Sequence, residues 1–136
     1  MIEVQCVTVD CADPYGLASW WGEALGLPLG ESDKPGDDEV MLDTGRYPFL
    51  LFIRVPEGKT VKNRLHLDVS ATGGGTRDKE VERLIALGAT LYEDHRQPDG
   101  TGWVTMLDPE GNEFCVCRSQ AEREARAVIG SGRRAP

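Results

Sequence analysis

The sequence predicts an α+β protein built from two tandem βαβββ modules, and three observations lead to this fold class. A β-rich run followed by a capped amphipathic helix and a glycine stop occurs twice, about sixty residues apart. Short β-like segments separated by turn residues follow each helix. A chain of 136 residues with 40% hydrophobic and 28% charged residues is also large enough for a packed core.

The first module is expected over residues 1–56. Its first strand is predicted at 4–9, where VQCVTV is rich in β-branched residues. Asp13 can cap a helix over 14–25, in which apolar residues recur at a spacing of three to four, and Gly26 supplies the stop. Three further strands are expected at 27–30, 39–43 and 48–55.

The second module is expected over residues 64–118 and repeats this order. A strand is predicted at 65–69, Thr76 can cap a helix at 77–87, and Gly88 ends that helix. The three strands that complete the module are expected at 89–93, 102–107 and 112–118.

The two modules are expected to form a single domain over residues 1–118, joined by a linker at 57–63. Residues 119–136 are predicted to form a C-terminal helix and a frayed tail, because Ser119 and Glu122 have the spacing of a capping box. Two small sheets leave unpaired edge strands, and this last helix carries an apolar stripe. A second copy of the chain would cover these surfaces, so we expect a homodimer.

Charge and composition exclude several classes of partner. A net charge of −8 opposes a phosphate backbone, so nucleic acid is not an expected partner. No stretch reaches the ~20 apolar residues that a membrane span needs, and the N-terminus lacks the pattern of a signal peptide. We therefore expect a cytoplasmic protein whose four cysteines are reduced thiols.

One face of the predicted strands carries polar and reactive side chains where a fully solvated face would favour Lys, Glu and Arg. Alternation along each strand assigns these side chains to the face opposite the helix-packing residues. A sheltered surface with a few polar groups is typical of a small-molecule pocket. The predicted ligand-binding residues are Cys6, Thr8, His66, Asp68, Trp103 and Cys115.

Two of these residues have a structural interpretation as well as a functional one. His66 either makes a directed contact to a ligand or is held by a partner such as Asp68 or a backbone carbonyl. Trp103 either stacks on a planar ligand or packs structurally. His95 lies in a polar, turn-rich segment, so it is expected to be solvated or at the rim of the pocket.

Three segments carry a resemblance to a known family: VTVDCADPYGLASWWGEALG at 7–26, KNRLHLDV at 62–69, and WVTMLDPEGNEFCV at 103–116. They resemble the glyoxalase/bleomycin-resistance/extradiol dioxygenase (vicinal oxygen chelate) superfamily. The D-P-E-G-N turn before the closing strand is the most specific match. The resemblance implies a cupped mixed β half-barrel with helices outside and a small-molecule site inside.

The resemblance also implies a divalent metal with four ligand positions, and this chain keeps one of them. His66 matches, but Cys6 and Cys115 stand where other ligands are usual, and residues 48–52 contain no carboxylate for the fourth. We therefore predict no cofactor. If a metal does bind, the expected ligands are His66 with Cys6 and Cys115, a soft set suited to zinc.

Two functions follow as expectations from this combination. The first is a protein that binds or sequesters a small organic ligand, with the family metal site largely lost. The alternative is a metal-assisted lyase, isomerase or dioxygenase of the same superfamily that uses His66 in an atypical ligand shell. The fold by itself does not decide between them.

Overall fold

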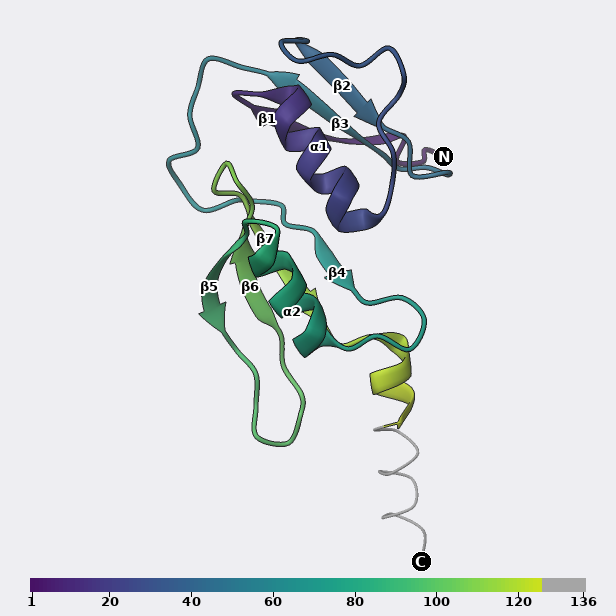
Figure 1. The fold of residues 1–136 in the computed structure, drawn as a ribbon, viewed down its shortest axis with the longest axis vertical. Helices are drawn as coiled ribbons and strands as arrows, with labels where there is room; N and C mark the ends of the chain where they lie inside the picture. Colours follow the sequence, from purple (N-terminus) through teal and green to yellow (C-terminus); the bar gives the residue numbers. More distant parts are fainter. Residues whose placement is uncertain (126–136) are drawn as a thin grey trace, which may run out of the picture. The chain divides into compact units, whose positions relative to one another are not determined.

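The computed structural model describes residues 1–125, which form two compact units that meet between Val61 and Lys62. The boundary between the units falls within residues 57–63, where the linker was expected. The predicted tail and the end of the predicted last helix lie outside the described residues. Figure 1 shows the order of the elements along the chain.

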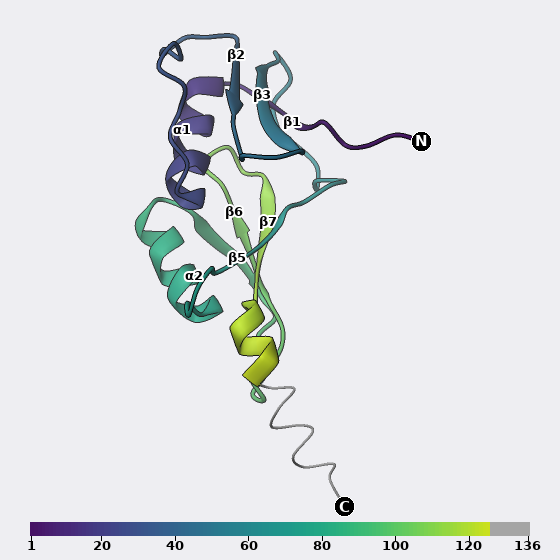
Figure 2. The same ribbon diagram turned by 90° about the vertical axis from the view of Figure 1, so that its right-hand side faces the viewer.

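The first unit holds one helix and a three-stranded sheet. Its elements are β1 (Cys6–Cys11), α1 (Pro14–Leu25), β2 (Glu39–Leu42) and β3 (Phe49–Arg54). The strand order is β1-β3-β2, with β1 parallel and β2 antiparallel to the central β3. In Figure 2, α1 lies beside the strands β2 and β3.

Local sequence explains where α1 begins and ends. The Asp13 carboxylate accepts a hydrogen bond from the Gly16 N–H at 3.1 Å, and Pro14 occupies the first turn, where its missing N–H has no cost. Gly26 ends the helix in the left-handed conformation at φ 71°. On the side facing the sheet, Leu17 and Trp21 are buried, so the predicted apolar face is the packing face.

The second unit holds the helix α2, a four-stranded sheet and the start of the C-terminal helix. Its elements are β4 (Asp68–Ser70), α2 (Arg77–Ala86), β5 (Thr90–Asp94), β6 (Val104–Leu107) and β7 (Glu113–Cys117). The strand order is β4-β7-β6-β5, with β4 parallel to β7 and the other neighbours antiparallel. The α+β class with its two strand-helix-strand modules is thus confirmed.

One expected strand is absent, and several others begin or end a few residues away from their expected bounds. Residues 27–30 form no strand, because Pro28 has no N–H to donate to a ladder and the Gly30 N–H instead donates to the Asp33 carboxylate in a turn. Within residues 1–125 there are consequently seven strands where eight were expected. The strand expected at 65–69 begins later, at Asp68, so His66 precedes it, although the Cys115 N–H still donates to the Leu67 carbonyl at 2.9 Å.

The second unit buries the alternate side chains that face α2. Val104 and Met106 of β6 and Phe114 and Val116 of β7 are at most 1% exposed. Because successive side chains on a strand point to opposite faces, the residues between them face away from α2. This second face is where the candidate site lies.

The C-terminal helix begins as predicted, with a reciprocal capping box. The Glu122 N–H donates to the Ser119 hydroxyl at 3.1 Å, and the Ser119 N–H donates to the Glu122 carboxylate at 2.9 Å. The described part of the helix ends at Ala125. Across residues 1–125, every helix is too short or too polar to cross a membrane.

Candidate functional site

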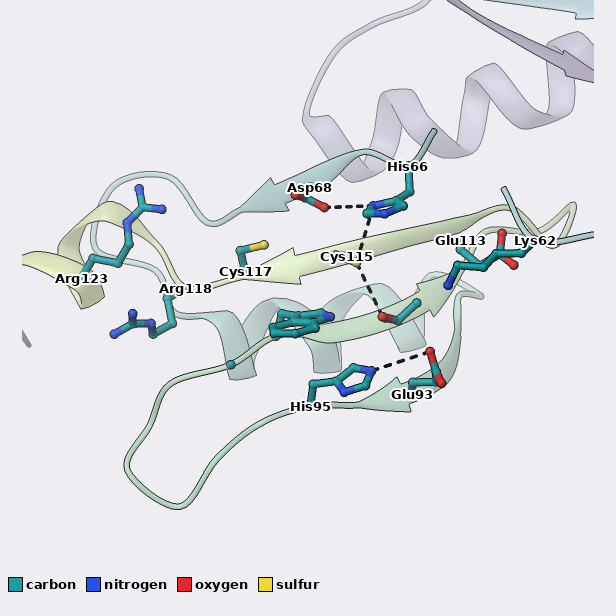
Figure 3. Close-up of a pocket in the computed structure, with 13 residues that line it drawn as sticks. Lys62, His66, Asp68, Glu93, His95, Glu113, Cys115, Cys117, Arg118 and Arg123 are labelled. Atoms are coloured by element: carbon teal, nitrogen blue, oxygen red, sulfur yellow. Dashed lines mark hydrogen bonds and ion pairs between the residues drawn. The ribbon is translucent and has the colours of Figure 1, made fainter. Parts of the chain in front are cut away.

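A pocket of about 570 Å³ opens on the face of the four-stranded sheet that points away from α2. This volume is in the range of sites that hold small organic molecules, roughly 300–1,000 Å³. All of its lining residues belong to the second unit, and Figure 3 shows them. They are Lys62, His66, Asp68, Glu93, His95, Gly102, Trp103, Thr105, Glu113, Cys115, Cys117, Arg118 and Arg123.

The floor of the pocket is one row of side chains that crosses the whole sheet. Asp68 of β4 is in register with Cys115 of β7, Cys115 with Thr105 of β6, and Thr105 with Glu93 of β5. Residues in register share a face of the sheet. Four polar side chains from four strands therefore converge on one surface although they span residues 68 to 115.

An irregularity in β5 brings one end of this row into the pocket. Leu91 pairs with Met106, and the next pair is Glu93 with Thr105. β5 therefore advances by two residues where β6 advances by one, which leaves one residue of β5 without a partner in the register. A bulge of this kind reverses which side chains face the pocket beyond it. Glu93 and then His95 consequently line the pocket, and an unbroken alternation along the predicted strand would not have placed them there.

A chain of polar contacts runs along the row from the β4 side, marked by dashed lines in Figure 3. The His66 Nδ1 lies 3.3 Å from an Asp68 carboxylate oxygen and 3.9 Å from the Cys115 sulfur. The Cys115 sulfur lies 3.6 Å from the Thr105 hydroxyl oxygen. The His66 side chain is 43% exposed, so it can contact a bound molecule while Asp68 orients its ring.

Burial raises the pKa of the Cys115 thiol. The hydrogen bond with Thr105 lowers it, the nearby Asp68 carboxylate raises it, and the charge of Lys62 lowers it slightly, so that the pKa is raised overall. The pKa of the Cys117 thiol is raised as well, first by burial and then by the charge of Asp68. The thiolate is the reactive form of cysteine. Both thiols are thus protonated near neutral pH and suit packing or weak hydrogen bonding better than nucleophilic attack.

The opposite side of the pocket is aromatic. The His95 ring stacks on the Trp103 indole, with ring centroids 4.7 Å apart and an interplanar angle of 26°. The His95 Nε2 also lies 3.7 Å from a Glu93 carboxylate oxygen. Trp103 remains 44% exposed, so the indole still presents an aromatic surface to the pocket. Both histidines of the sequence therefore line this pocket, and each lies beside a carboxylate two residues away.

Arg77 holds the loop that carries this aromatic side, and the sequence reasoning did not single it out. Its side chain is buried, and its Nη1 donates to the carbonyls of Gly100, Thr101 and Gly102 at 2.9–3.2 Å. Gly102 has φ +91°, and a Cβ there would lie 2.0 Å from the carbonyl oxygen of His95. No sequence signal marks this support, because the burial of Arg77 is visible only in the structure.

Four of the six predicted ligand-binding residues line the one pocket: His66, Asp68, Trp103 and Cys115. His66 and Trp103 do lie on the same side of the sheet, which the prediction required. Cys6 and Thr8 belong to β1 of the first unit, where they pair with Phe49 and Leu51 and are half-buried and exposed, respectively. They are not among the residues that line the pocket.

Three side chains offer metal-ligating atoms close together, and they differ from the predicted set. The His66 nitrogen, the Cys115 sulfur and an Asp68 carboxylate oxygen all lie within 4.8 Å of one another. Two of them, His66 and Cys115, belong to the predicted ligand set, and Asp68 is a further candidate ligand. Imidazole, thiolate and carboxylate together are a donor set that suits zinc. A metal ion would have to displace the proton of the Cys115 thiol in order to bind there.

The fold and the pocket define a class: a small α+β protein with duplicated strand-helix-strand modules and a ligand-sized pocket on an open sheet. The model of the family described as a glyoxalase-like domain matches residues 6–117, so the chain belongs to the glyoxalase-like domain family. No curated protein matches the sequence.

Solved structures similar to this chain have the same fold. A glyoxalase/bleomycin resistance protein/dioxygenase family enzyme from Burkholderia phytofirmans PsJN is 24% identical with a TM-score of 0.63, covering 85% of this chain and 97% of its own. A glyoxalase-related enzyme from Fulvimarina pelagi is 18% identical with a TM-score of 0.62, covering 86% and 88%. An Agrobacterium tumefaciens protein solved by NMR is 14% identical with a TM-score of 0.67, covering 86% and 97%.

Proposed function

We propose that this protein binds a small organic molecule in the pocket of its second unit, without turning it over. The observation that carries the proposal is the convergence of an exposed aromatic ring, Trp103, with His66 and Asp68 on one open surface. Such pockets combine apolar area with a few polar groups that orient the ligand.

The chemistry of the pocket favours binding over catalysis. Burial keeps the Cys115 thiol protonated, so it is a poor nucleophile. Of the ligand positions that the family resemblance implies, His66 is the match, and two others are cysteines. Metal-assisted chemistry on an oxygen-containing substrate usually relies on a firmly held ion with an open coordination position.

The experiment is a thermal-shift and calorimetric screen of the whole protein with a panel of small aromatic and aliphatic molecules. Trp103→Ala should weaken binding of aromatic hits about tenfold, as expected for loss of one aromatic contact. Tyr92→Ala is the matched control, because Tyr92 is an exposed aromatic residue of β5 that does not line the pocket. Equal effects of the two substitutions would contradict the proposal.

A metal-assisted lyase, isomerase or dioxygenase is the second candidate, and the close approach of His66, Asp68 and Cys115 is the observation that favours it. A divalent metal held there would polarise a substrate oxygen. Elemental analysis by mass spectrometry after dialysis tests this candidate. Stoichiometric metal that is lost in Asp68→Asn and Cys115→Ser would favour the enzyme over the binding protein.

We also propose that the protein is a cytoplasmic homodimer. The support is the pair of open sheets, each of which leaves two strands at its edges. Light scattering that reports only the 14.9 kDa species at micromolar concentration would argue against the dimer.

A further inference from the structure

We infer that the ligand is a planar ring that carries a carboxylate, with the acid held by Arg118 and Arg123 and the ring against Trp103. This inference rests on the proposed function, because it names the chemical class of molecule that the same pocket would bind. Its basis is the distribution of charge around the pocket wall.

The carboxylates of the pocket each have a partner in the protein. Asp68 lies beside His66 and Glu93 beside His95, and the buried Glu113 accepts a hydrogen bond from the Asn63 N–H at 2.9 Å. These three acids therefore serve to orient neighbouring groups.

The two arginines of the pocket are in the opposite situation. Among residues 1–125, no carboxylate lies within ion-pair distance of the Arg118 or Arg123 guanidinium, and neither makes a side-chain hydrogen bond. Other arginines of this unit, such as Arg77, Arg83 and Arg96, are paired with acids. Two unpaired guanidinium groups in a chain of net charge −8 mark a local site for an anion.

The position of the arginines gives the ligand a direction. In Figure 3, Arg118 and Arg123 lie at one end of the pocket. Lys62 lies at the other end next to Glu113, whose negative charge offsets the positive charge of Lys62. Cys117 lies between the arginines and the centre of the row. A molecule with its acid at the arginine end therefore extends over the neutral thiols toward the middle of the sheet.

The arginine end is built on a fixed segment of chain. Arg118 directly follows β7, and Arg123 lies in the first turn after the capping box of Ser119 and Glu122. The Glu122 carboxylate also accepts a hydrogen bond from the Arg77 N–H at 2.7 Å, which ties the start of the helix to the start of α2. Burial opposes ionisation of Glu122, but the hydrogen bonds from Ser119 and Arg77 lower its pKa overall.

The ring and the charge of the ligand follow from the other walls. Trp103 offers an indole that is stacked on one side by His95 and still 44% exposed, which suits a flat aromatic group. The three pocket carboxylates would repel a dianionic phosphate more strongly than a carboxylate monoanion. A single acid on a ring therefore matches the pocket better than a phosphorylated ligand does.

The test compares matched acids and amides by calorimetry on the whole protein at low salt. The probe pairs are benzoate with benzamide and 2-naphthoate with 2-naphthamide. Each acid should bind about tenfold or more tightly than its amide, and added salt should reduce the difference. The double substitution Arg118→Gln with Arg123→Gln should remove most of this preference, and Trp103→Ala should weaken acid and amide alike.

Arg64→Gln is the matched control, because Arg64 is an exposed arginine of the same unit that does not line the pocket. Circular dichroism of each variant verifies its fold. Amides that bind as tightly as the acids would overturn this inference and leave the proposed function standing. Failure of every acid and every amide to bind would also overturn this inference, and the proposed function would fall only if the wider panel of aromatic and aliphatic molecules failed to bind as well.

Discussion

The two units of this protein follow the same plan and differ by one strand. In each unit, the last strand has two neighbours. The first strand of the unit pairs with it in parallel, and the next-to-last strand pairs with it antiparallel. A helix follows the first strand in both. The second unit alone adds a strand directly after its helix, β5, at the far edge of its sheet.

That additional strand and the segment directly after it contribute to the pocket. Glu93 lies on β5 and His95 follows it, and the bulge in β5 turns both toward the pocket. In the first unit, the corresponding segment at 27–30 contains Pro28 and ends in a turn. The second unit therefore has an edge strand that contributes to its pocket wall, whereas residues 27–30 of the first unit form no strand.

Each unit also uses one arginine to tie down loops, and the two differ in burial. Arg54 donates from Nη1 to the Ala12 carbonyl and from Nη2 to the carbonyls of Gly36 and Asp37, yet its side chain is 39% exposed. The Arg77 side chain, which holds the loop before Trp103, is 5% exposed. Water can replace the contacts of the first arginine more readily than those of the second.

The largest predicted effect is therefore the difference between Arg77→Ala and Arg54→Ala. Removing the buried Arg77 side chain leaves three part-buried loop carbonyls without their donor, which should lower the free energy of unfolding by about 3 kcal/mol. Removing Arg54 should cost about 1 kcal/mol, because its loops are solvated. Urea unfolding of the two variants measures both values.

The Arg77 variant should also lose ligand binding, since the loop carries the aromatic side of the pocket. Arg83→Ala is the control, because it removes an arginine whose side chain forms an ion pair with Glu80 within the same helix. Equal destabilisation by Arg54→Ala and Arg77→Ala would show that burial does not distinguish the two units.

His66→Ala should weaken ligand binding about fivefold to tenfold, by loss of one directed hydrogen bond, with little change in stability. The reason is that the His66 side chain is 43% exposed and packs in no core. Calorimetry with a ligand and a thermal melt of the same variant give the two values. A large fall in melting temperature would instead assign His66 a structural role.

A smaller effect is expected in acid, at the end of β5. Side-chain and backbone hydrogen bonds with Arg96 lower the pKa of Asp94 from 3.8 to about 2. Because the folded-state pKa is depressed, the stabilisation is present above the unfolded value and is lost as pH falls from about 4 to about 2. Arg96→Gln should flatten this part of the stability–pH curve, measured by urea unfolding.

Lys79→Gln is the control for removal of one exposed positive charge from the same unit. It should lower or raise the whole curve without changing its slope between pH 4 and pH 2. An unchanged slope in Arg96→Gln would disprove the assignment to Asp94.

The smallest effect concerns the thiols of the two units. Cys115 is 7% exposed and its pKa is raised by burial, whereas Cys6 of β1 is half-buried. Iodoacetamide should therefore alkylate Cys115 more slowly than Cys6 at pH 7.5, with a rate that still rises above pH 9. Peptide mass spectrometry resolves the two sites, and equal rates at pH 7.5 would contradict the expectation.

Much of the fold could be predicted because the signals are local. Asp13, Gly26 and Thr76 mark helix ends through hydrogen bonds and backbone conformations that depend on a few neighbouring residues. The capping box of Ser119 and Glu122 was found for the same reason. The duplicated order of strand and helix then followed from two copies of one pattern.

Much of the pocket face could also be predicted, because alternation is strict within a regular strand. It brought Asp68 and Cys115 together, and it brought in His66 and Trp103 although each of these precedes its strand. Alternation did not extend to Glu93 and His95, since a bulge depends on how two strands pair and not on either sequence alone.

The sequence by itself determined the α+β class, the repeat, the helix ends and the polar face of the second sheet, because each depends on contacts between near neighbours or on a strict period. Only the tertiary structure decided the register that aligns Asp68, Cys115, Thr105 and Glu93. It alone also decided the burial of Arg77 under the loop at 100–102. These features arise from pairings between distant segments, whose free energy depends on which backbone groups meet.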